Sequence, residues 1–239
     1  MGTTMTKDGY TLTTQVNSEQ TPGFAFFSDT IRDALRGPMA NDAQTGYLAN
    51  ASGYASNVKK CFMGNASWCE SPTQAINYAS CHDNLALFDK LILSNPDASR
   101  EELIRMNNLS AAIIMTSQGV PFFQAGEEML RSKPLGDGKY DHNSYRSSDA
   151  INNLKWNDLN DEAYQGVYNY YKGLIAFRKA HPALRLTTAE AVEKNISVLS
   201  GLDNNVNGFH INGGVNGEES EGLVVIFNPR KENTSVLLP

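Results

Sequence analysis

Short apolar runs alternate with stretches of helical periodicity along the first three quarters of the chain. Residues 24–27, Phe-Ala-Phe-Phe, predict a short strand, and residues 28–36 predict a helix that stops at Gly37. Residues 74–80 predict a second strand, which runs directly into a polar cluster. Residues 85–93 then have a helix-like pattern. The order strand, helix, strand, helix is therefore set within the first hundred residues.

The same alternation continues in the middle of the chain. Ser99 and Glu102 have the spacing of a capping box, and an apolar stripe follows them as far as Gly119. Residues 120–124 predict a compact third strand. A long loop separates this strand from a helix predicted over residues 162–180, which ends at His181-Pro182. We expect the aromatic row of this helix to face the core. Its members are Tyr164, Tyr168, Tyr171 and Phe177.

Strands that alternate with helices favour parallel pairing with helices covering the sheet. In a (β/α) barrel the functional site is built at the carboxyl ends of the strands, where long loops such as residues 130–160 lie. Periodicity alone does not separate a barrel from an open, doubly wound sheet. Beyond residue 186 the pattern changes to short β-prone runs, at residues 196–199, 208–211 and 222–227. A domain boundary is therefore expected near residues 184–188.

Composition narrows the class of protein. Hydrophobic residues make up 41% of the 239 residues, and a further 19 residues are Gly. This composition is typical of a globular protein. A membrane span would need about 18 consecutive apolar residues, and the chain has no such run, so no membrane partner is expected. The net charge is −6, with Lys and Arg scattered, so nucleic acid is not an expected partner. The Met1 segment has no signal-peptide pattern, and localisation stays open.

Three cysteines suggest neither a disulfide framework nor a metal site. A single disulfide between Cys61 and Cys69 is compatible with the sequence. The spacing of the three cysteines matches no standard zinc pattern. Cys81 precedes His82, but adjacent side chains in an extended segment point to opposite sides, which disfavours a Cys–His nucleophile. A thiol or zinc enzyme would show metal content or sensitivity to alkylation, and we expect neither.

The polar cluster after the second predicted strand carries a family resemblance. The segment Ile76-Asn-Tyr-Ala-Ser-Cys-His-Asp-Asn-Leu85 resembles the seventh-strand motif of the α-amylase superfamily, glycoside hydrolase family thirteen, in the form seen in type I pullulanases. Other segments agree in order. Residues 23–37 look like the sixth strand and helix, 118–128 like the eighth strand, 130–133 with 143–145 like the substrate loop, and 175–184 like the last barrel helix.

The resemblance implies an α/β chain made of the last three strands of a TIM (β/α)₈ barrel, followed by a partial all-β sandwich. Residues 1–185 would be the C-terminal part of the catalytic barrel, and residues 186–239 the start of the sandwich. In this family the nucleophilic Asp and the general acid Glu follow the fourth and fifth strands, upstream of the matched region. Retaining cleavage needs both carboxyl groups about 5–5.5 Å apart. We therefore expect no activity from this chain alone, and a missing N-terminal half of the barrel as its partner.

The resemblance assigns roles to the polar cluster. Asp83 would be the third carboxylate of the family, which stabilises the transition state, and His82 would donate to sugar hydroxyls with its other ring nitrogen held by the protein. The structural alternative for Asp83 is the N-cap of the following helix. Asn84 would either bind sugar or satisfy the backbone of its loop, and both interpretations stay open.

The loop after the third strand supplies the other candidates. Arg131, Asn143 and Tyr145 would position glucosyl units through polar contacts and ring stacking. The alternative is a loop tied down by its own hydrogen bonds. Glu127 and Glu128 are adjacent, so their side chains diverge and a structural role is favoured over a paired-carboxylate site.

The function implied by the resemblance is retaining hydrolysis of α-1,6-glucosidic bonds in pullulan, glycogen or starch dextrins, so the expected partner is an α-glucan substrate. Alternatives are an α-1,4-acting amylase or branching relative, and a non-catalytic glucan-binding protein derived from an enzyme. No cofactor is expected for this chain, and calcium is left open for the parent enzyme.

Overall fold

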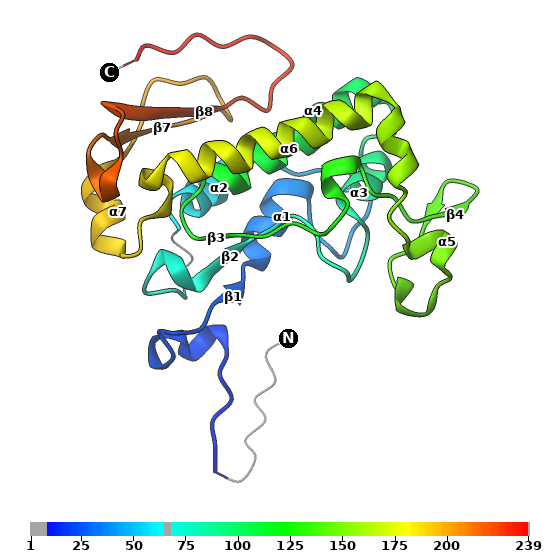
Figure 1. Ribbon diagram of the computed structural model, residues 1–239, viewed down its shortest axis with the longest axis horizontal. Helices are drawn as coiled ribbons and strands as arrows, with labels where there is room; N and C mark the ends of the chain where they lie inside the picture. The colour runs from blue at the N-terminus through cyan, green and yellow to red at the C-terminus, as the bar shows by residue number, and fades with distance from the viewer. Residues whose placement is uncertain (1–8, 65–67, 239) are drawn as a thin grey trace.

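The computed structural model describes residues 9–64 and 68–238 (Figure 1). Most of the Met1 segment, in which the sequence shows no signal peptide, lies outside these residues. The described chain contains a three-stranded parallel sheet, a three-stranded antiparallel sheet and a two-stranded hairpin, with helices between them. The fold is therefore mixed α and β, as the alternating pattern predicts.

The parallel sheet consists of β1 (Phe26–Phe27), β2 (Ala75–Asn77) and β3 (Val120–Pro121), in that order. Phe27 is paired with Ile76, and Ile76 with Val120, so these three residues form one row across the sheet. All three strands confirm the sequence prediction but are shorter than predicted.

The helices predicted from periodicity all form. The longest are α4 (Arg100–Thr116) and α6 (Glu162–Ala180), which lie side by side in Figure 1. The capping box at the start of α4 is present, since Ser99 Oγ accepts from Glu102 N and the Glu102 side chain accepts from Ser99 N. The shorter helices are α1 (Asp29–Arg36), α2 (Ala55–Phe62), α3 (Leu87–Ser94) and α5 (Asp149–Asn152).

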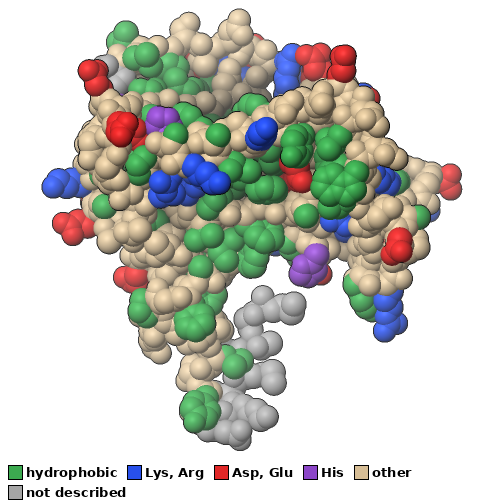
Figure 2. Space-filling model, in the orientation of Figure 1, with side chains coloured by type: hydrophobic (Ala, Val, Ile, Leu, Met, Phe, Trp, Pro, Cys, Tyr) green, Lys and Arg blue, Asp and Glu red, His purple; other side chains and the backbone are tan. Residues whose placement is uncertain are grey.

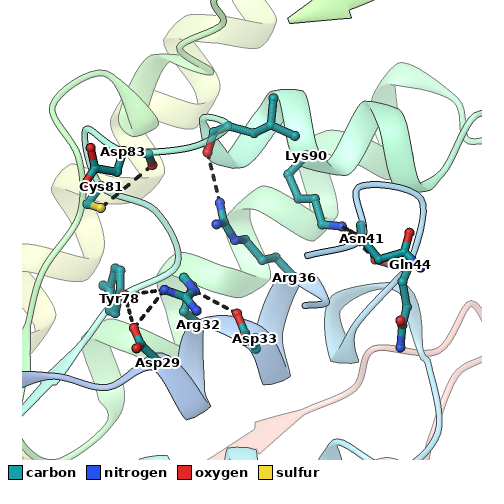
Figure 3. A network of polar contacts seen from close by, with 11 residues as sticks. Asp29, Arg32, Asp33, Arg36, Asn41, Gln44, Tyr78, Cys81, Asp83 and Lys90 are labelled. Atoms are coloured by element: carbon teal, nitrogen blue, oxygen red, sulfur yellow. Dashed lines mark hydrogen bonds and ion pairs between the residues drawn. The ribbon is translucent and has the colours of Figure 1, made fainter. Parts of the chain in front are cut away.

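Gly37 ends α1 for a steric reason. Its φ is +92°, a value that side-chain-bearing residues rarely adopt, and a Cβ at this position would lie 2.2 Å from Gln44 O. The close approach brings the loop of residues 41–44 back against α1. Lys90 of α3 then holds the same loop, because its Nζ donates to the carbonyl oxygens of Asn41, Asp42 and Gln44 at 2.7, 2.9 and 2.9 Å (Figure 3).

The C-terminal quarter forms the antiparallel sheet, with β6 (Ile196–Val198), β7 (Asn207–Asn212) and β8 (Gly222–Phe227) in sequence order. The predicted runs are confirmed, and a helix that the sequence analysis does not predict, α7 (Ala189–Asn195), precedes them. The remaining elements are β4 (Pro134–Gly136), β5 (Lys139–Tyr140) and the 3₁₀ turns η1 (Gln15–Gln20), η2 (Tyr47–Ala49), η3 (Pro72–Gln74), η4 (Glu127–Met129), η5 (Ser144–Arg146), η6 (Trp156–Asn160), η7 (Pro182–Arg185) and η8 (Val215–Gly217).

One hydrophobic core joins the helices to the antiparallel sheet. Phe62 of α2 stacks on Phe209 of β7, with ring centroids 3.8 Å apart and planes 12° from parallel. Buried residues on both sides of the expected boundary, Leu184 and Leu186 among them, belong to the same cluster. The division into residues 1–185 and 186–239 stays a prediction, and the two parts share packed side chains.

The parallel sheet is covered on one face. Ala75 and Asn77 of β2 are buried, whereas the row on the other side includes Phe27 and Val120, which are 41% and 39% exposed. Figure 2 shows hydrophobic side chains gathered beneath α6, over the region where Figure 1 draws β3. Exposed large apolar residues in register on a parallel sheet are unusual, because such sheets are normally buried on both faces.

One expectation from the sequence is confirmed only in part, and one alternative that the sequence leaves open is decided. The aromatic row of α6 faces the core only in part: Tyr171 is buried and Tyr164 packs against the core, whereas Tyr168 and Phe177 are each 38% exposed. The buried side chains of this helix are those of Val167, Tyr171 and Arg178. Tyr168 follows Val167 by one residue and is therefore rotated away from the buried stripe. The Cys61–Cys69 bridge that the sequence leaves open is not formed, and the two thiols donate to different groups, Ser117 Oγ at 3.7 Å and Gly64 O at 3.4 Å.

Candidate active site

The candidate site lies on the loop that follows β2 at its carboxyl end. The side chains of His82 and Asp83 are 87% and 67% exposed, and His82 Nε2 lies 3.5 Å from Asp83 Oδ1. Asp83 is not a helix cap, because α3 begins at Leu87 and its N-cap residue is Ala86. The structural alternative for Asp83 is therefore wrong. The His82 ring contacts its neighbour Asp83.

Asn84 has a left-handed backbone conformation, with φ of +64°, which turns the chain sharply after Asp83. Its carbonyl oxygen accepts a hydrogen bond of 3.0 Å from Lys133 Nζ. This contact satisfies the loop backbone, as one of the two interpretations of Asn84 requires. Asn84 borders a pocket of about 130 Å³ together with Arg36, Lys90 and His142.

Lys133 joins two of the loops that carry predicted site residues. Its side chain is fully buried, and Nζ donates to Asn84 O and, at 3.3 Å, to Ser144 Oγ. Ser144 lies between Asn143 and Tyr145. Burial, and after it the charge of Arg131, lower the pKa of Lys133. One buried ammonium thus ties the Asp83 loop to the Asn143–Tyr145 loop.

Asp89 of α3 fixes the backbone at Lys133 in turn. Its carboxylate accepts from Ser132 Oγ and, at 2.8 Å, from Lys133 N. Burial raises the pKa of Asp89, and these two hydrogen bonds oppose that rise. The sequence analysis misses both residues in this role. The one available signal is an aspartate inside the apolar stretch of residues 85–93.

Arg131 is tied to its own loop. Its guanidinium donates to the carbonyl oxygens of Ala125 at 3.0 Å and Asn152 at 2.6 Å, which is the arrangement of the structural alternative. Asn143 is exposed, and its backbone N donates to Asp141 Oδ1 at 2.8 Å. Tyr145 is 74% exposed, and the Arg146 guanidinium lies 5.2 Å from its ring centroid. Asn143 and Tyr145 are therefore accessible to a ligand.

A second carboxylate lies near this edge of the sheet and was also missed. Asp29 begins α1 just after β1, and its Oδ1 accepts from Tyr78 OH at 2.7 Å and from Arg32 Nη1 at 2.8 Å (Figure 3). Tyr78 lies just after β2, so the contact joins the ends of two neighbouring strands. The Asp29 side chain is 58% exposed. An aspartate directly after a predicted strand is the sequence signal that could have indicated it.

Glu127 lies beneath the candidate loop. It is buried, and its Oε1 accepts from Ser80 Oγ and from Gln124 N, both at 2.8 Å. Burial raises the pKa of Glu127 to about 7, against the opposing effect of these donors. The neighbouring Glu128 accepts from Gly126 N instead, so the two carboxyl groups serve different contacts.

Within residues 9–64 and 68–238 there is no group of three or more His, Cys, Asp or Glu side chains that could hold a metal ion. No helix in these two ranges is both long and apolar enough to cross a membrane.

Comparison with solved structures relates the whole arrangement to one class of protein. Pullulanase from Bacillus acidopullulyticus superposes with a TM-score of 0.86 at 32% identity, covering 91% of this chain and 26% of that one. Pullulanase from Paenibacillus barengoltzii, in complex with maltohexaose and α-cyclodextrin, superposes with a TM-score of 0.86 at 34% identity, covering 94% of this chain and 35% of that one. No family model matches the chain.

Sequence comparison agrees with the structures. Pullulanase of Bacillus subtilis (strain 168) is 34% identical over 190 residues, which are 77% of this chain and 26% of the relative. The chain belongs to the pullulanase family of the α-amylase superfamily. It spans about a quarter of the length of the curated relatives that it matches.

We predict that Lys133→Met loosens both loops that Lys133 joins. Methionine keeps the length of the side chain but donates no hydrogen bond, so Asn84 O and Ser144 Oγ lose their partner. Amide hydrogen exchange should accelerate in residues 82–86 and 141–147. The exposed Lys139→Met, on the hairpin, is the control and should change neither segment. Unchanged exchange in Lys133→Met would contradict the structural role of this ammonium.

We predict a pH-dependent stability from Glu127. Because its folded-state pKa is raised from 4.5 to about 7, the stabilisation is complete below about pH 4.5 and is lost as the pH rises to 7. Glu127→Gln removes this loss. The free energy of unfolding of the variant should therefore rise relative to the natural chain between pH 4.5 and 7.5, by on the order of 2–3 kcal/mol. Urea unfolding at both pH values measures this, and a pH-independent difference would contradict it.

Proposed function

We propose that this chain contributes to hydrolysis of α-1,6-glucosidic bonds in pullulan, glycogen or starch dextrins, with retention of configuration. The observation that carries the proposal is Asp83, a solvent-exposed carboxylate at the carboxyl edge of a parallel sheet, on a loop held by buried side chains. Carboxylates placed at this edge are typical of catalytic sites in (β/α) barrels. Family membership supports the same assignment.

We propose further that β1, β2 and β3 are the last three strands of a (β/α)₈ barrel, and that β6, β7 and β8 begin the C-terminal sandwich. The parallel order and the helix after each of the first two strands support the barrel. The row formed by Phe27, Ile76 and Val120 would face the barrel interior. Strands β1 and β3 are the edges of this sheet, to which the upstream strands would add.

Asp83 would stabilise positive charge at the anomeric carbon. Retaining cleavage passes through an oxocarbenium-like transition state, and a fixed carboxylate near the sugar hydroxyls favours the distorted ring that leads to it. His82 would donate a hydrogen bond to a hydroxyl of the same sugar. The 3.5 Å approach of His82 Nε2 to Asp83 Oδ1 supports a joint action of the two side chains on one ligand.

Asn84, Arg131, Asn143 and Tyr145 would hold the flanking glucosyl units. Tyr145 has an exposed ring on which a sugar can stack, and the Asn143 side chain is open to solvent. Arg131 would act indirectly, since its guanidinium already binds two carbonyl oxygens of the loop. Asn84 would act through its side chain at the pocket, because Lys133 occupies its carbonyl oxygen.

The nucleophile and the general acid would come from the missing N-terminal half of the barrel. The two catalytic carboxyl groups of a retaining enzyme lie about 5–5.5 Å apart across the scissile bond, and no segment of this chain has the family's motif for either. Alone, the chain is proposed to be inactive. Its own residues need no cofactor for these roles, and any calcium would belong to the parent enzyme.

We predict that Asp83 is required for turnover when the chain is combined with an upstream pullulanase portion that ends after the fifth barrel strand. Asp83→Asn keeps the size of the side chain but removes its charge, and should lower pullulan hydrolysis at least about 100-fold. A reducing-sugar assay on pullulan measures this. Asp97→Asn, an exposed change in the turn before α4, is the matched control.

Other outcomes separate the alternatives. Equal activity of Asp83→Asn and Asp97→Asn would contradict the role of Asp83. Release of sugar from amylose but not from pullulan would favour an α-1,4-acting amylase. Retained affinity for amylopectin without turnover, in the combined protein, would favour a non-catalytic glucan-binding protein.

A further inference from the structure

The loop that carries His82 and Asp83 is exposed in its middle and buried at both ends. Ser80, just before it, and Leu85, just after it, are both buried. The loop therefore spans only a few residues between two fixed points. What holds these points decides where the Asp83 carboxylate stands.

Each fixed point is held by a buried side chain from a different part of the chain. Ser80 Oγ donates to Glu127 Oε1 at 2.8 Å. Arg36 Nη1 donates to Leu85 O at 3.0 Å, and Figure 3 shows this Arg36 contact. Arg36 belongs to the last turn of α1, and Glu127 opens η4. Both Arg36 and Glu127 are buried, so neither contact is screened by solvent.

The contact at Glu127 is the more specific of the two. Two donors, Ser80 Oγ and Gln124 N, share one acceptor oxygen, Glu127 Oε1. Ser80 is three residues before Asp83, and Gln124 is in the segment that follows β3. One acceptor oxygen thus links the segment that follows β2 to the segment that follows β3.

We propose that Glu127 is a positioning residue that holds the Asp83 loop through Ser80, acting as a hydrogen-bond acceptor rather than as a charge. The inference rests on the proposed function in taking Asp83 as the group whose position matters. A glutamine at this position keeps the Oε1 acceptor for both donors, whereas a leucine removes it. The glutamine variant tests whether the negative charge of Glu127 matters. The leucine variant tests whether filling the space without an acceptor is sufficient.

The test compares the natural chain with Glu127→Gln, Glu127→Leu and Ser80→Ala by amide hydrogen exchange at pH 7. Exchange of residues 81–86 should rise about tenfold in Glu127→Leu and in Ser80→Ala, and should stay near the natural rate in Glu127→Gln. Exchange in α4 reports overall stability and should be unchanged in Ser80→Ala. Glu193→Leu, an exposed carboxyl on α7, is the control.

Several results would overturn the proposal. One is an exchange rate of residues 81–86 in Ser80→Ala that equals the rate in the natural chain. Another is an equal change of this exchange rate in Glu127→Gln and Glu127→Leu. If Glu127→Leu unfolds the chain, Ser80→Ala and Glu127→Gln still decide the outcome.

A second readout separates this inference from the proposed function. In the combined enzyme, Ser80→Ala should lower kcat on pullulan about tenfold with little change in KM, while Glu127→Gln should stay close to the natural value. If the exchange results hold but Asp83→Asn leaves turnover unchanged, the positioning of the loop stands and the proposed function fails. If turnover depends on Asp83 but not on Ser80, the proposed function stands and the positioning role fails.

Discussion

The placement of one exposed carboxylate depends on buried polar contacts beneath it. The loop from Cys81 to Asn84 has no strand or helix of its own to hold it. Its position is set by Glu127, Arg36 and Lys133, which bind the chain before, after and within the loop. Each anchor is a buried side chain with a polar end, and removing the partner of such a group costs more than losing an exposed contact. The loop is therefore anchored by buried contacts, although Asp83 itself faces solvent.

The second constraint is the uncovered face of the parallel sheet. Helices cover one side, while Phe27 and Val120 remain substantially exposed on the other. Hydrophobic side chains aligned across a parallel sheet gain free energy when a further layer or further strands exclude water from them. This exposed face and the Asp83 loop belong to the same sheet, so the partner that covers the face would also complete the site. The proposed upstream half of the barrel meets both requirements.

Sequence periodicity predicts the helices and strands of this chain better than it predicts the contacts between side chains. The helices α4 and α6 and the three strands of each larger sheet follow from apolar spacing and capping residues. Only part of the aromatic row of α6 faces the core, because Tyr168 and Phe177 lie beside the buried stripe to which Tyr171 belongs. The anchors were missed for another reason. Glu127 and Ser80 are 47 residues apart in sequence, and Lys133 and Asn84 are 49 apart, so no local pattern reveals that these charged groups are buried.

The central claim is that an α-glucan binds at the edge of the sheet marked by Asp83. The most direct measurement is an NMR titration of the combined protein with maltotetraose, in which only this chain carries the isotope label. We expect the largest shifts at His82, Asp83 and Asn84, with further shifts at Asn143 and Tyr145. Shifts confined to the antiparallel sheet, or no shifts in this chain at saturating sugar, would contradict the account.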